Sequence, residues 1–91
     1  MALHLLYNPL RLIPLIDTCQ EGDAIILFDQ ALQQWPDLHS ASAPPLTSAV
    51  YALRDECRQQ NLNVAHEGVM EISFADWVEL AAQHAQQVSW V

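Results

Sequence analysis

The sequence contains no lysine and only three arginines, whereas it contains eleven aspartate and glutamate residues. The formal net charge of the 91-residue chain is therefore −8 at pH 7. Proteins that bind nucleic acid directly use clustered lysine and arginine to neutralise phosphates, and an acidic surface repels a polyanion. We therefore predict that this chain does not bind nucleic acid directly.

Glycine, cysteine and long apolar runs are also scarce. Two glycines are too few to build a glycine-rich phosphate loop. Two cysteines are too few for a disulfide scaffold, and no export signal is recognisable, so we expect reduced thiols and a cytoplasmic location. No stretch approaches the roughly 18 uninterrupted apolar residues of a membrane span, so none is predicted.

The polar residues do not follow a known catalytic or metal-binding pattern. The histidines and cysteines lack the close spacing of zinc ligands, and there is no Ser-His-Asp motif. We therefore predict no metal and no cofactor, and we do not expect catalysis by this chain alone. His4 lies inside a predicted strand, where we expect a packed, hydrogen-bonded imidazole; a role as a base is the alternative.

The composition is rich in apolar residues for a small protein. Apolar residues make up 52% of the chain and charged residues 15%, against about 25% charged in typical proteins. A chain of this length forms one domain, residues 1–91, with a modest core. Few polar groups remain to cover its surface, so we expect an exposed apolar patch that a partner covers.

Short apolar runs alternate with helical patterns along the chain. The runs predict strands over residues 2–7, 24–28, 49–53, 69–72 and 88–91. The continuous apolarity of residues 24–28 is typical of a strand covered on both faces. Strands that alternate with helices form parallel βαβ units. We therefore predict an α/β fold, a small three-layer flavodoxin-like domain with a mainly parallel sheet of about five strands.

Capping and turn residues set the expected limits of the first helices. Asn8 is expected to cap the first helix, Pro14 to keep it short and Gly22 to end it. Asp29 is expected to be the N-cap of the second helix, and Pro36 is expected to stop it. Residues 39–48 are expected to form a surface loop, and residues 64–67 a brief extended piece.

The last helix carries the strongest local pattern. Ser73 and Asp76 have the spacing of a capping box, in which each side chain accepts a hydrogen bond from the other residue's backbone. The residues that follow at helical spacing are expected to pack on the sheet: Phe74, Trp77, Val78 and Ala81. Asp76 and Glu79 are expected to face outward.

Four residues are candidates for a functional site. Cys19 is expected near a helix C-terminus, where acidic neighbours favour the neutral thiol, so we expect an inert residue; a reactive thiol is the alternative. Trp90 is one residue from the end of the sequence, where a large aromatic side chain indicates docking on the domain's own edge or on a partner. Trp77 fits the core, and together with Phe74 it is also an interface candidate. Cys57 is expected to be buried.

Several short segments carry a further signal through their order and spacing along nearly the whole chain. They are Leu3-His4, Asn8-Pro9, Glu21-Gly22-Asp23, Val50–Leu53, Ile72–Leu80, His84 and Val88–Trp90. In this arrangement they resemble the DsrH/TusB family of sulfur-relay proteins. The segment from His4 to Gly22 is shorter than the family norm.

The resemblance implies a small α/β fold and a cytoplasmic hetero-oligomer with two related subunits, one DsrE/TusD-like and one DsrF/TusC-like. It implies transfer of persulfide sulfur between cysteines, with the principal relay cysteine on a partner subunit. TusB-type systems direct the sulfur to 2-thiolation of wobble uridine in tRNA, and DsrH-type systems use it in sulfur oxidation. Some DsrH-type members also carry a cysteine in the first helical region, where Cys19 lies.

We therefore expect a non-catalytic subunit of a sulfurtransferase complex that supports tRNA thiolation. The first alternative is a DsrH-type subunit in sulfur oxidation that carries sulfur on Cys19. The second is a stand-alone homo-oligomer of the same fold with a regulatory role.

Overall fold

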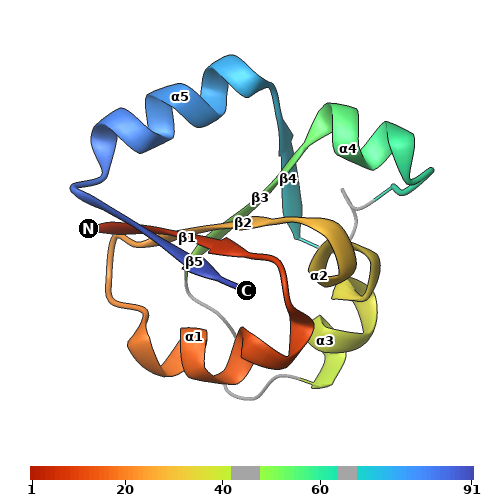
Figure 1. Cartoon of the computed structure of the whole chain (residues 1–91), viewed down its shortest axis with the longest axis horizontal. Helices are drawn as coiled ribbons and strands as arrows, with labels where there is room; N and C mark the ends of the chain where they lie inside the picture. The colour runs from red at the N-terminus through yellow and green to blue at the C-terminus, as the bar shows by residue number, and fades with distance from the viewer. Residues whose placement is uncertain (42–47, 64–67) are drawn as a thin grey trace.

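The described strands all run parallel in one sheet, as the alternation of strands and helices predicts (Figure 1). The computed structural model describes residues 1–41, 48–63 and 68–91, and for residues 39–41 only the backbone. The strands are β1 (Ala2–Leu6), β2 (Ala24–Leu27), β3 (Ala49–Leu53), β4 (Val69–Ile72) and β5 (Gln86–Trp90). Their order in the sheet is β4-β3-β2-β1-β5. The predicted fold class, a small flavodoxin-like α/β domain with five strands, is confirmed.

Helices connect these strands. They are the 3₁₀ helix η1 (Pro9–Arg11) and the α-helices α1 (Leu12–Thr18), α2 (Asp29–Gln33), α3 (Trp35–Ala41), α4 (Arg54–Gln59) and α5 (Phe74–Gln83). The described residues contain no helix with both the length and the apolar character to cross a membrane.

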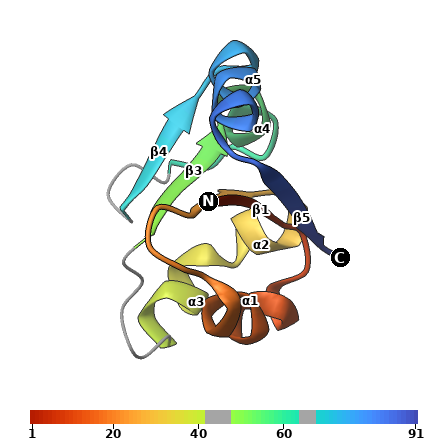
Figure 2. The same ribbon diagram turned by 90° about the vertical axis from the view of Figure 1, so that its left-hand side faces the viewer.

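The helices cover the two faces of the sheet unequally. Figure 2 shows α1, α2 and α3 on one side of the sheet and α5 on the other, with α4 drawn behind α5. On one face, apolar residues of α1, α2, α3 and α4 form a core cluster with Leu6, Ile25, Leu27, Val50 and Ala52. On the other face, Leu3, Leu5, Ala24, Ile26 and Phe28 pack against α5, the one described helix on that side. Right-handed crossovers explain the division, because β1 to β4 step one way along the sheet and the chain then returns to β5.

The start of the first helical region is as expected, but its end is not. The Asn8 side chain accepts a hydrogen bond from the Leu10 N–H, which confirms the predicted cap. Pro14 lies in the first turn of α1, where proline is tolerated, and α1 has only seven residues. Gly22 does not end the helix, because α1 stops at Thr18. Gly22 instead takes a left-handed φ of +88° in the turn before β2.

Two predictions for the second helix are wrong. Phe28 is the N-cap of α2, while Asp29 is its first residue and has a left-handed φ of +49°. The Asp29 N–H is bonded at 2.6 Å to a Glu56 carboxylate oxygen from α4, a tertiary contact that the local sequence does not reveal. Pro36 does not end the helix but lies in the first turn of α3, where its missing N–H has no helical partner to lose.

The expected loop over residues 39–48 is partly wrong as well, because α3 continues to Ala41. Residues 42–47 and the predicted extended piece over residues 64–67 lie outside the described residues. Strand β5 begins at Gln86, two residues earlier than predicted. Its polar start is fixed by parallel pairing with β1, in the register Ala2 to Gln86 and Leu6 to Trp90.

The predicted capping box of α5 is present, but half of its predicted apolar stripe does not touch the sheet. Ser73 and Asp76 exchange two side-chain to backbone hydrogen bonds of 3.1 Å each. Trp77 and Ala81 pack on the sheet together with Leu80. Phe74 and Val78 are instead 67% and 54% exposed. A single helix meets a sheet along one line, so an apolar arc wider than that line stays in solvent.

Candidate functional site at the amino ends of the strands

Cys19 lies at the edge of the sheet where the strands begin. It is the C-cap of α1, four residues before Asp23 and five before Ala24, where β2 starts. This edge is opposite the carboxyl ends of the strands, where ligands of open α/β sheets usually bind. The side chain is half-buried and packs against the core cluster that α1 to α4 share.

The environment of Cys19 favours the neutral thiol. Burial raises the pKa of Cys19, and the nearby Asp23 carboxylate raises it further. A hydrogen bond with the Ser48 side chain acts in the opposite direction but leaves the pKa of the thiol above its ordinary value. Because the thiolate is the nucleophilic form, this cysteine is a weak nucleophile near pH 7. The structure thus agrees with the sequence-based expectation for the thiol.

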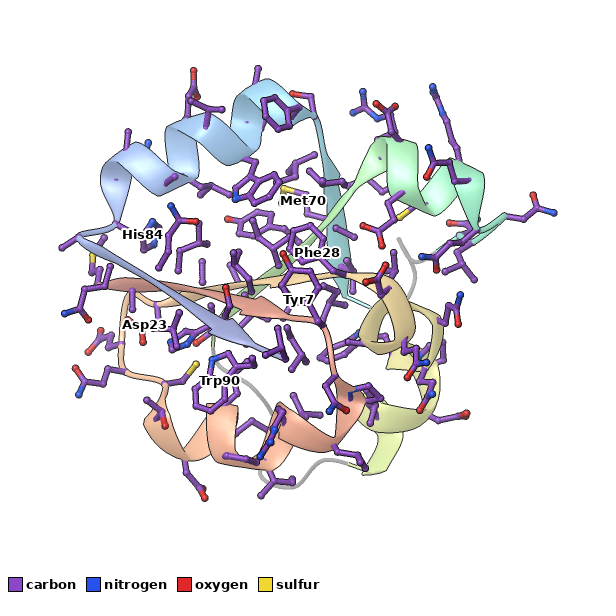
Figure 3. All side chains as sticks on the ribbon, in the orientation of Figure 1. Tyr7, Asp23, Phe28, Met70, His84 and Trp90 are labelled. Atoms are coloured by element: carbon purple, nitrogen blue, oxygen red, sulfur yellow. The ribbon has the colours of Figure 1, made fainter. Side chains whose placement is uncertain are left out.

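A buried imidazole lies next to Cys19 and is hydrogen-bonded through both ring nitrogens. His4 from β1 is 1% exposed, and its Nε2 lies 2.9 Å from Oδ2 of Asp23. The Trp90 indole N–H from β5 points at its Nδ1, 3.1 Å away. Figure 3 shows Asp23 and Trp90 on the same side of β1, the side of α1.

These contacts determine the protonation of His4. Indole nitrogen can only donate a hydrogen bond, so Nδ1 must be the accepting, unprotonated nitrogen. The ring proton is therefore on Nε2, which donates it to the Asp23 carboxylate. His4 is a neutral imidazole with both nitrogens occupied, as expected for a packed histidine, and it has no lone pair available for use as a base.

Asp23 connects three segments of the chain. Besides His4, its carboxylate accepts hydrogen bonds from the backbone N–H of Ala2 at 2.8 Å and of Gln20 at 3.0 Å. Burial by itself would raise the pKa of Asp23, but the bonds from His4, Ala2 and Gln20 outweigh it and lower the pKa to about 2. The carboxylate is therefore charged in the folded protein and ties β1 to the turn after α1.

An open hollow of about 970 Å³ lies over this edge of the sheet. Cys19 and Asp23 line it together with Met1, Tyr51 and His84. The imidazole of His84 lies 2.6 Å from the Leu80 carbonyl through Nδ1, so that nitrogen donates and fixes the ring at the end of α5. The hollow therefore presents a neutral thiol, a buried carboxylate and a fixed imidazole.

The structure brings His4, Cys19 and Asp23 together in a way that sequence spacing did not predict. One ligand atom of each lies within 4.8 Å of the others, and these are residue types that bind metal ions. A metal on Nε2 of His4 would move the ring proton to Nδ1, where it would face the Trp90 N–H. Two donors would then oppose each other, so this arrangement does not suit a metal ion, and the predicted absence of a metal stays a prediction.

The interface candidates occupy different positions. Trp90 folds back on its own domain, half-buried against the core cluster and bonded to His4. Trp77 is half-buried on the opposite face, with its ring 5.2 Å from that of Phe28. Phe74 is exposed beside it. Cys19 and the two α5 aromatics thus lie on opposite faces of the sheet and do not form one site.

Cys57 is fully buried in α4, as expected. Burial raises the pKa of its thiol to about 11, with a further contribution from the nearby Glu71. This thiol is structural.

We predict that Asp23 makes the stability of the protein depend on acid pH. Its pKa is about 2 in the folded chain and 3.8 ordinarily, so its contribution is present above about pH 5 and is lost as the pH falls towards 2. In urea denaturation, Asp23→Asn should lower the free energy of unfolding at pH 6 and change it much less at pH 2.5. Asp17→Asn, at an exposed position of α1, is the control. An equal loss at both pH values would contradict the prediction.

We also predict that Cys19 reacts slowly with iodoacetamide at pH 7 and that its rate rises with an apparent pKa above that of an ordinary thiol. Asp23→Asn should shift this apparent pKa downward, because the Asp23 charge helps to raise it. Peptide mapping by mass spectrometry separates Cys19 from Cys57. Fast alkylation of Cys19 at pH 7 would show a thiolate and would refute the description of this site.

No family model matches the chain, and no curated protein matches it. A function for this protein must therefore be argued from its own residues and their geometry.

Proposed function

We propose that this chain is a cytoplasmic, non-catalytic subunit of a sulfur-relay complex that supports 2-thiolation of wobble uridine in tRNA. The specific basis is the resemblance of its segments to the DsrH/TusB family. The observation that carries the proposal furthest is the network of His4, Asp23 and Trp90. Each comes from a different one of those segments, and the three side chains meet although His4 and Trp90 are 86 residues apart.

The state of the two thiols favours an accessory role. Sulfur passes along a relay when an acceptor thiolate attacks the outer sulfur of a persulfide, forms a new S–S bond and releases the donor thiolate. The exchange needs a thiolate on the acceptor. Cys19 has a raised pKa, and Cys57 is buried with a pKa of about 11. The relay thiol is therefore assigned to a partner subunit.

The charge of the chain supports the same division of roles. A net charge of −8 without any lysine provides no surface for tRNA. Contact with the RNA is therefore assigned to another component of the pathway, and this chain contributes to the assembly of the complex. The expected partners are the two related α/β subunits, one DsrE/TusD-like and one DsrF/TusC-like.

One observation favours a second candidate function, a DsrH-type subunit that carries sulfur in sulfur oxidation. Cys19 is half-buried rather than buried, and it lines the open hollow at the amino ends of the strands. A partner that places a cation beside the thiol would lower its pKa and allow it to accept sulfur.

Co-expression with the two partner subunits tests the proposal. We expect the three proteins to co-elute in size exclusion, and ³⁵S from labelled cysteine and a cysteine desulfurase to appear on a partner cysteine. Cys19→Ser should leave both results unchanged. Deletion of the gene should remove 2-thiouridine from tRNA.

Label on Cys19 that is lost in Cys19→Ser would favour the second candidate, as would normal 2-thiouridine in the deletion strain. Failure of the folded chain to co-elute with either subunit would refute the proposed function.

A further inference from the structure

The outer side of α5 has the properties of a protein interface. Of the described helices, α5 is the one that covers its face of the sheet, and none of its ten residues is fully buried. The opposite face is covered by α1, α2, α3 and α4. One layer of this small domain is therefore much thinner than the other.

Helical geometry divides α5 into distinct sides. With 3.6 residues per turn, Trp77, Leu80 and Ala81 point at the sheet, which their packing confirms. An adjacent side of the helix consists entirely of exposed apolar residues, and we call it the α5 apolar side: Phe74, Ala75, Val78 and Ala82. It carries no charged residue along its length.

A groove extends this surface towards the edge of the sheet. Phe74, Trp77, Val78 and Ala81 line it together with Gln87 of β5, and its volume is about 200 Å³. Gln87 pairs with Leu3 of β1, whose side chain packs on the α5 face, so Gln87 lies on that face too. The groove therefore lies between α5 and the exposed end of the sheet.

The exposed ring of Phe74 is held by a chain of aromatic contacts. The ring of Phe74 lies edge-on to that of Trp77, with 5.7 Å between the ring centroids. The centroids of Trp77 and the buried Phe28 are 5.2 Å apart. Phe28 in turn stacks on Tyr7 at 4.7 Å. An aromatic side chain that is ordered before binding loses little conformational entropy when a partner covers it, and such residues often dominate binding energy.

The charges next to the α5 apolar side indicate what kind of partner fits. Asp76 and Glu79 are exposed along the far border of the helix. No ion pair joins Glu79 to another described residue. Arg54 and Arg58 of α4 line a small pocket with Phe74 at the amino end of α5, and Arg11 lies in η1. The surface is thus apolar, with an acidic border along its outer side at Asp76 and Glu79 and two arginines at its amino end.

A second copy of this chain is a poor match for this surface. It has no lysine, its net charge is −8, and it would bring its own Asp76 and Glu79 to the contact, whereas its Arg54 and Arg58 lie at the amino end of α5 and not along this border. Like charges at a partly desolvated interface are unfavourable. A different chain with lysine or arginine at the border would pair with these acids and leave the apolar contact intact.

We propose that the α5 apolar side and its groove bind a partner subunit through an apolar strip that is bordered by lysine or arginine. This inference rests on the proposed function, because it identifies the surface through which the chain joins the complex. The contact covers the outer side of α5 and leaves Cys19 uncovered, because Cys19 packs on the other face of the sheet.

The test compares a double variant with a matched control in the co-expressed complex. Phe74→Glu with Val78→Glu changes two exposed residues of the surface. Leu10→Glu with Ile13→Glu changes two residues of η1 and α1 that are 84% and 58% exposed. We expect the first variant to weaken binding to the partner subunits at least tenfold and the second to bind like wild type. Circular dichroism checks the fold of each, and Phe74→Ala with Val78→Ala provides the comparison if the glutamates unfold the chain.

Charge reversal tests the basic border. Glu79→Lys should weaken the complex several-fold at low salt, and the variant complex should lose less affinity than wild type when NaCl rises from 50 to 500 mM. An unchanged or stronger complex would exclude a basic border.

The possible failures are distinguishable. If wild type binds its partners and the Phe74/Val78 variants bind equally well, the interface inference is wrong and the proposed function stands. If the wild-type chain binds neither subunit, both the interface inference and the proposed function are wrong. If sedimentation shows that the chain alone dimerises at micromolar concentration through these residues, the occupant is a second copy and the proposed partner is wrong.

Discussion

One neutral imidazole, that of His4, connects three segments of the domain through hydrogen bonds. His4 donates to Asp23 through Nε2 and accepts from Trp90 through Nδ1, and so connects β1 with the turn before β2 and with the edge strand β5. Each of these polar groups is buried or half-buried, so loss of one partner leaves another unsatisfied, at a cost of roughly 1–3 kcal/mol. A charged imidazole would set two N–H donors against each other at Trp90. These hydrogen bonds thus depend on the imidazole proton staying on Nε2 of His4.

The same network determines the chemistry of the neighbouring thiol. Asp23 must be charged to hold His4 and the backbone of Ala2 and Gln20, and its charge helps to keep Cys19 neutral. A stable amino-terminal edge and a reactive Cys19 are therefore in conflict. This conflict, together with the exposed apolar side of α5 on the other face, is what supports the proposed accessory role in an assembly.

The sequence was sufficient to predict the fold but not the site. Continuous apolar runs located β1 to β4 within a residue, and the Ser73–Asp76 spacing gave the capping box, because both signals are local. The predictions for Asp29 and Pro36 are wrong because the roles of these residues depend on features that are not local. Asp29 makes a contact with Glu56, and Pro36 follows the break between α2 and α3. His4 and Asp23 are 19 residues apart, and only the pairing of β1 with β5 brings Trp90 to them. Cys19 and Asp23 stand four residues apart, and this short spacing is the local signal of the site in the sequence.

Nitrogen-15 NMR of the histidine ring tests which nitrogen of His4 carries the proton. In long-range ¹⁵N–¹H spectra at pH 7.5, His4 should show a protonated Nε2 and an unprotonated Nδ1, and the Trp90 indole proton should exchange slowly with solvent. Trp90→Phe should remove the donor at Nδ1 but leave the proton on Nε2, because the charged Asp23 carboxylate still accepts it. A proton on Nδ1 of His4 in the wild-type protein, or a rapidly exchanging Trp90 indole, would contradict the account.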